Sequence, residues 1–94
     1  MTKKEITDNI ARRSGITAEA VKTVIDLYAE EVSKSLIAGE NVYHRGFGTF
    51  RLVRRAAKVG RDISRGVTFT IPEHTAPGFK PSPELVNAVK EANL

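Results

Sequence analysis

The feature that most constrains the fold of this chain is one stretch, residues 46–70, which reads GFGTFRLVRRAAKVGRDISRGVTFT. It opens with a phenylalanine between two glycines, Gly46 and Gly48, which permit a positive φ or a close approach of the backbone. A basic strand then runs to Gly60, a turn occupies residues 61–66, and apolar residues alternate with threonines after it. Alternation with a period of two is typical of a strand, so the stretch predicts a β-hairpin.

The predicted hairpin also concentrates the positive charge of the chain. It carries six basic side chains and one acidic one, Asp62, whereas the whole chain has a formal net charge of +4. A solvated edge that only prevents aggregation would favour lysine and mixed signs. Five of the six cations are arginine, whose planar fork suits phosphates and narrow grooves. We therefore predict a polyanion-binding surface formed by Arg51, Arg54, Arg55, Lys58, Arg61 and Arg65.

Between residues 53 and 71 the hairpin has few apolar side chains for its length. A two-stranded ribbon with so little to bury is marginally stable alone. We expect it to project from the body and to stay mobile until a partner orders it. From Arg54 to Arg61, the ribbon would reach roughly 25 Å at the usual strand spacing, which is comparable with the width of a DNA duplex.

Two helices are predicted before the hairpin. A capping box that begins at Thr2 and a glycine stop at Gly15 predict a helix over residues 3–14. Apolar residues then recur at threes and fours, which predicts a longer helix over residues 18–38. The short connection between them resembles that of a helix-turn-helix motif. Acidic side chains dominate the exposed face of the second helix, however, so we do not expect it to read a DNA groove.

The remaining segments complete an α+β fold. Residues 41–45 read as a strand, and a second strand starts at Thr49. Prolines delay the last helix until Ser82, which caps it with Pro83 at its first position. We predict two N-terminal helices, a three-stranded antiparallel sheet with a long protruding β-hairpin arm, and a C-terminal helix. They form one domain, residues 1–94, with parts at 1–45, 46–76 and 77–94.

The chain is too short to be very stable alone. A protein of 94 residues buries only about two-thirds of its unfolded surface, so we expect part of its apolar surface to pack against a second chain. Phe47, Phe50 and Phe79 are more plausible as core or interface anchors than as platforms for bases. The N-terminus has no apolar segment of signal-peptide length and no stretch could span a membrane, so a cytoplasmic location is expected.

The sequence contains no motif typical of a catalytic site or of a metal site. There is no cysteine, hence no disulfide, thiolate nucleophile or zinc finger. His44 and His74 lie in different segments, without the spacing of metal ligands. The glycine turn at residue 46 lacks the lysine and helix of a phosphate loop. We predict no catalytic residue, no metal, no cofactor and no small-molecule substrate, and a protein that is not an enzyme.

The chain resembles the bacterial HU / integration host factor family over essentially its whole length. The GFGTF run with a basic arm behind it is the most specific part of this resemblance. The residues that carry it are Gly46-Phe47-Gly48-Thr49-Phe50, Arg55-Ala56, Gly60-Arg61 and Pro77-Gly78-Phe79.

The resemblance implies an intertwined dimer whose helices form a base and whose arms wrap DNA through the minor groove. It implies DNA contacts along the arm at Arg51, Arg54, Arg55, Lys58, Arg61, Ile63, Arg65, Thr68 and Thr70. It implies further contacts on the saddle and flank at Lys3, Arg45, Gly46, Gly48 and Lys80. It implies a dimer core that contains Phe47, Phe50, Phe79, Val32 and Leu36.

The tip of the arm departs from the family pattern. Family members usually have Gly-Arg-Asn-Pro there, with the proline wedged between base pairs, whereas this chain reads Gly60-Arg61-Asp62-Ile63. Isoleucine is also an apolar wedge in minor-groove binders. Ile63 is thus the predicted wedge, although it is less rigid than proline and Asp62 adds a negative charge near the phosphates.

The resulting hypothesis is a homodimeric architectural protein of the nucleoid that binds and bends double-stranded DNA with little sequence preference. One alternative is a site-specific bender of the integration host factor type, which includes a heterodimer with a paralogue. A different class of alternative is an interaction module whose basic hairpin binds an acidic protein. RNA is a third possible partner, because a basic ribbon also fits structured or single-stranded RNA.

Overall fold

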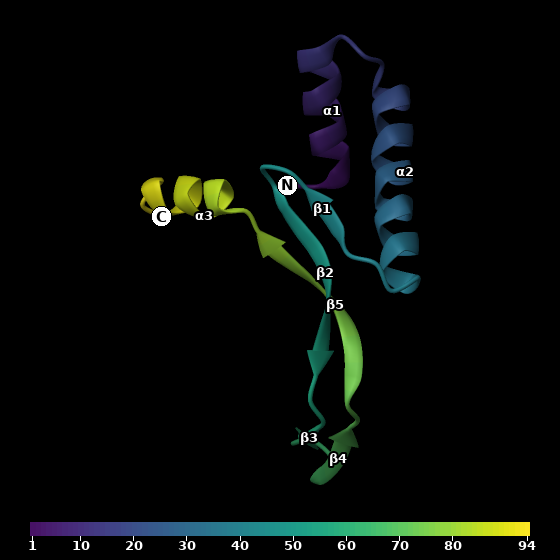
Figure 1. Cartoon of the computed structure of the whole chain (residues 1–94), viewed down its shortest axis with the longest axis vertical. Helices are drawn as coiled ribbons and strands as arrows, with labels where there is room; N and C mark the ends of the chain where they lie inside the picture. The colour runs from purple at the N-terminus through teal and green to yellow at the C-terminus, as the bar shows by residue number, and fades with distance from the viewer. The chain divides into compact units, whose positions relative to one another are not determined.

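The computed structural model describes residues 1–94 and has an α+β architecture (Figure 1). The chain divides into two compact units, residues 1–35 and 36–94. The predicted class, with two helices first and one helix last, is confirmed. The elements in chain order are α1 (Lys3–Ser14), α2 (Ala18–Ile37), β1 (Val42–His44), β2 (Gly48–Arg55), β3 (Lys58–Asp62), β4 (Val67–Ile71), β5 (His74–Pro81) and α3 (Pro83–Glu91).

The first helix, α1, starts and stops at the capping residues that the sequence predicts. The Thr2 hydroxyl accepts a hydrogen bond from an amide of the first turn of α1 at 3.2 Å, and Gly15 ends this helix with a φ of +76°. The Thr17 hydroxyl accepts one from the first turn of α2, also at 3.2 Å. α2 ends at Ile37, one residue earlier than predicted. None of the three helices combines the length and the apolar character needed to cross a membrane.

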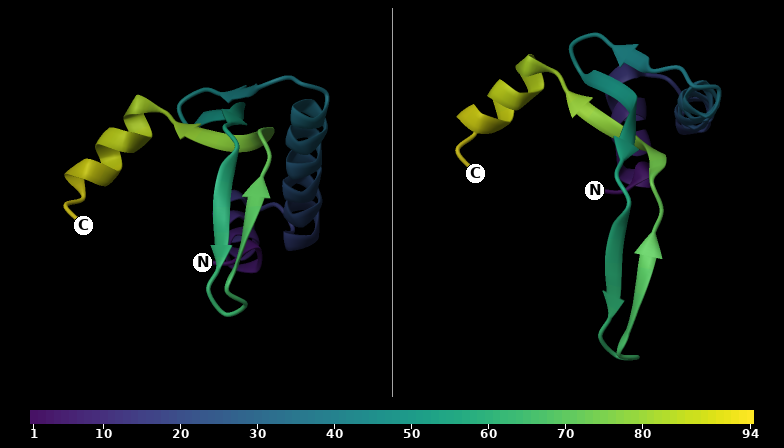
Figure 2. Two further views of the ribbon diagram at one scale, coloured as in Figure 1. Left: turned by 90° about the horizontal axis from the view of Figure 1, so that it is seen from below. Right: turned by 60° about the horizontal axis from the view of Figure 1, so that its bottom comes forward.

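The second unit is built on one antiparallel sheet with a ribbon that extends from it. The sheet has the strand order β1-β2-β5, which confirms the three predicted strands. Beyond it, β3 and β4 form a separate two-stranded ribbon that continues the paths of β2 and β5 (Figure 2). We refer to β3, β4 and the turn between them, residues 58–71, as the arm.

A short interruption separates the arm from the sheet. The β2–β5 ladder ends at the pair Arg55 and His74, and the arm ladder starts at Lys58 and Ile71. Two residues on each strand therefore leave the ladder, and one of them is Pro72, which has no amide hydrogen to donate. The base of the arm is thus a natural place for the ribbon to change direction.

The turn at the tip of the arm is shorter than predicted. The sequence placed it at residues 61–66, but Arg61 and Asp62 still belong to β3, so only residues 63–66 turn. The Asp62 carboxylate explains the difference, because it accepts hydrogen bonds from the Ser64 hydroxyl at 2.7 Å and from the Arg65 amide at 3.3 Å. Such Asx-type bonds close a turn locally and let the strand run up to it.

The two glycines around Phe47 serve the two different purposes that the sequence allowed. Gly46 has a φ of +80°, which favours glycine. Gly48 instead allows a close approach, since a Cβ there would lie 2.5 Å from the Cζ atom of Phe79 and 2.6 Å from the backbone oxygen of Lys80. The aromatic turn therefore depends on both glycines, for different reasons.

We expect Gly48→Ala to destabilise the protein by about 1–3 kcal/mol, the usual cost of overpacking a close contact. The Lys80 oxygen is backbone and cannot move aside without shifting β5. Gly78→Ala is the matched control, because a Cβ at Gly78 would meet the Cγ2 atom of Val53 at 3.0 Å and the nearest backbone atom, the Arg51 oxygen, only at 3.9 Å. Urea unfolding should show a much lower midpoint for the first variant than for the second, and equal midpoints would contradict this account.

The single chain buries very little. Val21 and Val32 are its only buried apolar side chains, and no large side chain is fully buried. The accessible surface is 7848 Å², whereas a folded monomer of 10.3 kDa exposes about 5,400 Å². A large apolar surface therefore remains uncovered in one copy.

Candidate nucleic-acid interface

The β2–β5 ladder sorts its side chains onto two chemically different faces. Residues paired across an antiparallel ladder point to the same side, and neighbours along a strand alternate. Arg51 and Arg55 therefore share one face, and Lys80 joins them because it pairs with Thr49. We call Arg51, Arg55 and Lys80 the basic face.

The basic face is open to a large partner. All three of its side chains are exposed, and none forms an ion pair with a carboxylate. The residues paired with β2 on this face include Gly78, opposite Arg51, and Ala76, opposite Val53. Because these residues have little or no side chain, nothing bulky projects from β5 at these two positions, and a polyanion could lie against the face.

The opposite face of the same ladder is aromatic. Phe50 pairs with Phe79 there, and their ring centroids lie 5.1 Å apart. Phe47, from the turn, lies 5.1 Å from Phe79 and 6.4 Å from Phe50. The residues Phe47 and Phe79 remain 42% and 40% exposed. The predicted aromatic cluster is thus present within one chain but incompletely covered.

Arg54 differs from its neighbour Arg55 although the sequence treats the two alike. It pairs with Thr75 and lies on the aromatic side of the ladder. Its Nε atom donates to the Glu73 carboxylate at 2.8 Å, and its Nη1 atom to the Thr75 hydroxyl at 3.1 Å. Arg54 remains a predicted DNA contact, but its guanidinium is already occupied in the free protein.

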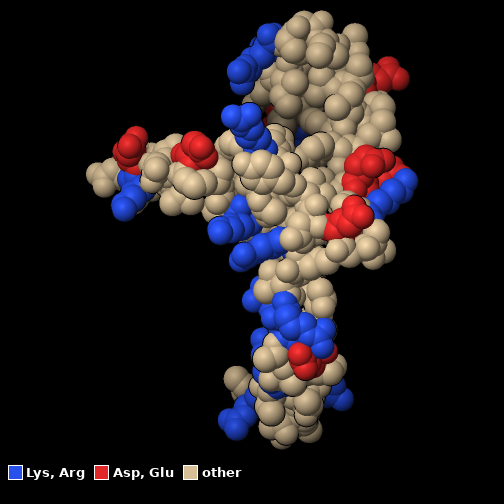
Figure 3. All heavy atoms as spheres, in the orientation of Figure 1, with Lys and Arg blue, Asp and Glu red and all other residues tan.

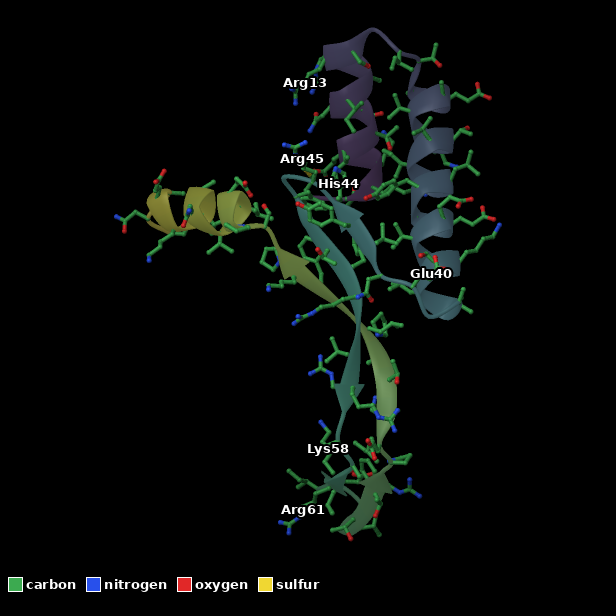
Figure 4. All side chains as sticks on the ribbon, in the orientation of Figure 1. Arg13, Glu40, His44, Arg45, Lys58 and Arg61 are labelled. Atoms are coloured by element: carbon green, nitrogen blue, oxygen red, sulfur yellow. The ribbon has the colours of Figure 1, made fainter.

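The arm carries the remaining predicted contacts of the hairpin. Lys58 and Arg61 project from β3 into solvent (Figure 4). Thr68 pairs with Arg61, and Thr70 lies two residues further on the same face. On the other face the Phe69 ring covers Gly60, where a Cβ would lie 2.5 Å from two ring atoms.

The tip of the arm presents the predicted wedge. Ile63 is 86% exposed at the start of the turn that the Asp62 carboxylate closes. Arg65 follows in the same turn, with its Nε atom 3.9 Å from Asp62. The negative charge of Asp62 is therefore partly engaged within the turn. An apolar side chain with cations on both sides suits insertion between stacked bases near phosphates.

The start of α3 is joined to the turn that carries Gly46 and Gly48. The Ser82 hydroxyl donates to the Gly46 oxygen at 3.0 Å, and the Ser82 amide donates to the Phe47 oxygen at 2.9 Å. The same hydroxyl accepts from the Leu85 amide at 3.1 Å and caps the helix. Ser82 thus fixes the helix start relative to the turn and to the exposed side chain of Arg45 next to it (Figure 4).

Within the second unit, most of the charged side chains visible on the arm and its base are basic (Figure 3). Only small acidic areas interrupt them there, while the acidic side chains of α3 lie apart from the arm. A ribbon of one sign with few counter-charges attracts polyanions.

Lys3 lies in the other unit and is engaged in an ion-pair cluster. Its Nζ atom lies 2.8 Å from the Asp26 carboxylate, and the Nζ atom of Lys22 lies 3.2 Å from the same carboxylate. The hydrogen bond from Lys3, followed by that from Lys22, lowers the pKa of Asp26 from its usual value of 3.8. A phosphate that binds Lys3 must compete with Asp26.

We expect the Asp26 cluster to make stability depend on acid. Because the folded state lowers the pKa of this carboxyl, the contribution is fully present above the usual value of 3.8 and is lost as pH falls below it. Asp26→Asn should abolish this component in thermal midpoints measured against pH. Asp8→Asn, whose carboxylate meets only Lys4, should change the profile less. A profile for Asp26→Asn that matches the unchanged protein would contradict the assignment.

Sequence reasoning missed three features of this surface. It did not separate Arg54 from Arg55, although counting alternate residues from Phe50 would have done so. It did not anticipate Glu73 as a partner for Arg54. It also left His74 unassigned, although His74 pairs with Arg55 and lies on the side of the basic face. No group of three or more histidine, cysteine, aspartate or glutamate side chains suited to a metal occurs in residues 1–94.

Comparisons with known proteins agree with this geometry. The family described as bacterial DNA-binding protein matches residues 1–90. The DNA-binding protein HU of Thermotoga maritima is 38% identical over 90 residues, covering 96% of this chain and all of the relative. The integration host factor subunit beta of Saccharophagus degradans is 37% identical over 93 residues, covering 98% of this chain and 95% of the relative.

A solved structure extends the comparison to the fold. The structure of Anabaena HU in a cocrystal with DNA matches with a TM-score of 0.86 and 26% identity. The match covers 95% of this chain and 97% of that one. That structure contains Anabaena HU together with DNA.

Proposed function

The chain belongs to the family of bacterial DNA-binding proteins that includes HU and integration host factor, and on that premise we propose that it binds double-stranded DNA through the minor groove and bends it with little sequence preference. The family consists of architectural DNA-binding proteins rather than enzymes, which agrees with the prediction that this protein is not an enzyme. The proposal places the protein in the nucleoid.

The observation that carries this proposal is the division of the β2–β5 ladder into two faces. Three exposed cations without carboxylate partners occupy one face, and a half-exposed aromatic cluster occupies the other. Cations that neutralise phosphates release condensed counterions, which gives affinity without reading the sequence. The basic face has no Asn or Gln side chain, the type that reads adenine in the major groove. The chemistry therefore favours binding to the backbone.

We propose that the working form is a homodimer. The surface in excess of a folded monomer is roughly 2,400 Å² per chain, and interfaces of obligate dimers have this order of size. The half-exposed side chains of Phe47 and Phe79 support the aromatic face as part of the area that a second chain would cover. Val32, which was predicted for the dimer core, is already buried within one chain, and Leu36 is half-buried.

Bending would follow docking. The basic face holds the duplex, the arms settle in the minor groove, and Ile63 enters a base step. Unstacking costs a few kcal/mol per step, and the extra contacts of the wrapped duplex offset it. Thr68 and Thr70 would line the groove beside Arg61, since all three lie on the same face of the arm.

We expect Ile63→Ala to reduce bending more than affinity. Removing the exposed side chain at the tip leaves the phosphate contacts intact but takes away the wedge. Energy transfer between dyes on the two ends of a duplex measures the bend, and anisotropy measures the affinity. Val67→Ala is the control, because Val67 is also exposed on the arm, at 48%, but pairs with Asp62 on the face opposite to the one proposed to line the groove. An unchanged bend for Ile63→Ala would remove this residue from the wedge role.

The alternatives make different predictions about partners. A site-specific bender of the integration host factor type would prefer one duplex over a scrambled one by a large factor, whereas the proposed function predicts near-equal affinity. A module that binds an acidic protein would keep its partner after nuclease treatment. The third alternative is that RNA is the natural ligand, and it is tested by letting RNA compete with duplex DNA for the protein. Equal affinity for two unrelated duplexes, with RNA competing poorly, supports the proposed function.

A further inference from the structure

His74 occupies a position on the candidate interface that no role yet explains. It is the first residue of β5 and pairs with Arg55, so its side chain lies on the side of the basic face. The residue is exposed. It stands where the sheet ends and the arm begins, next to the cation that the proposed function places against DNA.

The hydrogen bond of the His74 ring fixes its tautomer. The Nδ1 atom lies 2.9 Å from the backbone oxygen of Pro72. A carbonyl oxygen can only accept, so Nδ1 must carry the hydrogen. In the neutral ring the other nitrogen, Nε2, then carries a lone pair and no proton.

This arrangement makes the charge state of the ring decide whether it can bind a phosphate. A lone pair on Nε2 repels a phosphate oxygen, while the protonated ring offers a positive charge and an N–H donor at the same atom. The Pro72 carbonyl holds Nδ1–H in both states, so Nδ1 is not available as a substitute donor. Contact between His74 and DNA therefore requires uptake of a proton.

We propose that His74 is a proton-linked phosphate contact, which makes the affinity of this protein for DNA rise as pH falls through the histidine range. The inference rests on the proposed function, because it assumes that the basic face meets the DNA backbone. The ligand is the phosphodiester itself, so the effect should not depend on base sequence.

The charged groups around His74 support this reading. Across the ladder lies Arg55, a fixed positive charge that belongs to the basic face. The nearest carboxylate along the chain, Glu73, points to the other side of the ladder and is paired with Arg54 at 2.8 Å. β5 is an outer strand in the sheet order, so β2, which carries Arg55, is its one neighbouring strand in the sheet. Phosphates are thus the anions that would favour its protonation.

The sign of the effect follows from proton counting. On the proposal, the complex holds more protons than the separated protein and DNA, so affinity rises as pH falls through the range in which histidine side chains take up a proton. With one such residue per chain, a dimer takes up at most about two protons, and log Kd changes by at most about two per pH unit. In the proposed dimer, His74 of each chain would form one exposed ion pair with a phosphate. Loss of these two ion pairs corresponds to roughly a three- to tenfold loss of affinity between about pH 6 and about pH 8.

The test compares charge states at position 74 on a single labelled duplex at constant ionic strength. Anisotropy titrations at about pH 6 and about pH 8 give the affinities of the unchanged chain, His74→Gln and His74→Lys. We expect His74→Gln to bind weakly at both values and His74→Lys to bind tightly at both. His44→Gln is the control, since His44 lies on the aromatic side, 5.2 Å from the Phe47 ring, and it should keep the dependence on pH.

Calorimetry in two buffers with different heats of ionisation counts the protons directly. Uptake that disappears in His74→Gln supports the proposal. Uptake that persists in His74→Gln, or tight binding of the unchanged chain that does not vary with pH, would overturn it while leaving the proposed function intact. An absence of DNA binding at every pH would instead overturn the proposed function.

Discussion

Phe79→Ala should lower the free energy of unfolding by about 3–5 kcal/mol, the range for removing a phenylalanine from a core. The ring contacts both other members of the aromatic cluster at centroid distances of 5.1 Å, and it fills the space above Gly48. If a second chain covers the cluster, the variant also loses dimer stability. Urea unfolding at several protein concentrations measures both effects, because the midpoint of a dimer rises with concentration.

Phe69→Ala is the matched control for this prediction. Phe69 is a phenylalanine of the same unit, but it lies on the arm, is 50% exposed and covers only Gly60. Its removal should change the unfolding midpoint little. Equal losses of unfolding free energy in the two variants would contradict the view that the aromatic face stabilises the fold more than the arm does.

The second large effect concerns DNA binding. The double variant Arg51→Ala/Arg55→Ala removes two cations of the basic face from each chain, or four from a dimer. The slope of log affinity against log salt should then become shallower by about 3 to 4. Affinity at low salt should fall by about a hundredfold or more. Anisotropy titrations at several salt concentrations measure both quantities.

The single variants Arg54→Ala and Arg55→Ala give a matched comparison. They remove the same side chain from adjacent positions on opposite faces of β2. Arg55 has no carboxylate partner, whereas Arg54 is paired with Glu73 at 2.8 Å. Arg55→Ala should weaken binding and flatten the salt slope more than Arg54→Ala. A larger effect from Arg54→Ala would mean that DNA approaches the other side of the ladder.

Local chemistry explains why the helices were predictable. Thr2, Gly15 and Ser82 act within a few residues of themselves, so their capping roles can be seen in the sequence. The same holds for the glycines around Phe47, since a short aromatic turn needs either a positive φ or room for a neighbour. The three strands of the sheet followed from alternation and from the hairpin between them.

The features that the sequence did not predict depend on partners distant in the chain or on one hydrogen bond. The strand extends to Asp62 because of the bonds that its carboxylate makes in the turn. The separation of Arg54 from Arg55 depends on register, and the partner of Arg54 is nineteen residues away. Lys3 meets Asp26 across two helices. Patterns within one segment cannot reveal such pairings.

A single measurement tests the central claim most directly. The purified chain is titrated into a duplex of roughly 35 base pairs, which is short enough to stay straight without protein, with a dye at each end and a scrambled duplex beside it. Three phosphate contacts from each of two hairpins predict a log–log salt slope near about −5, with energy transfer rising on both duplexes. Tight binding without a rise in energy transfer would contradict bending, and an absence of binding at low salt would contradict a DNA-binding role altogether.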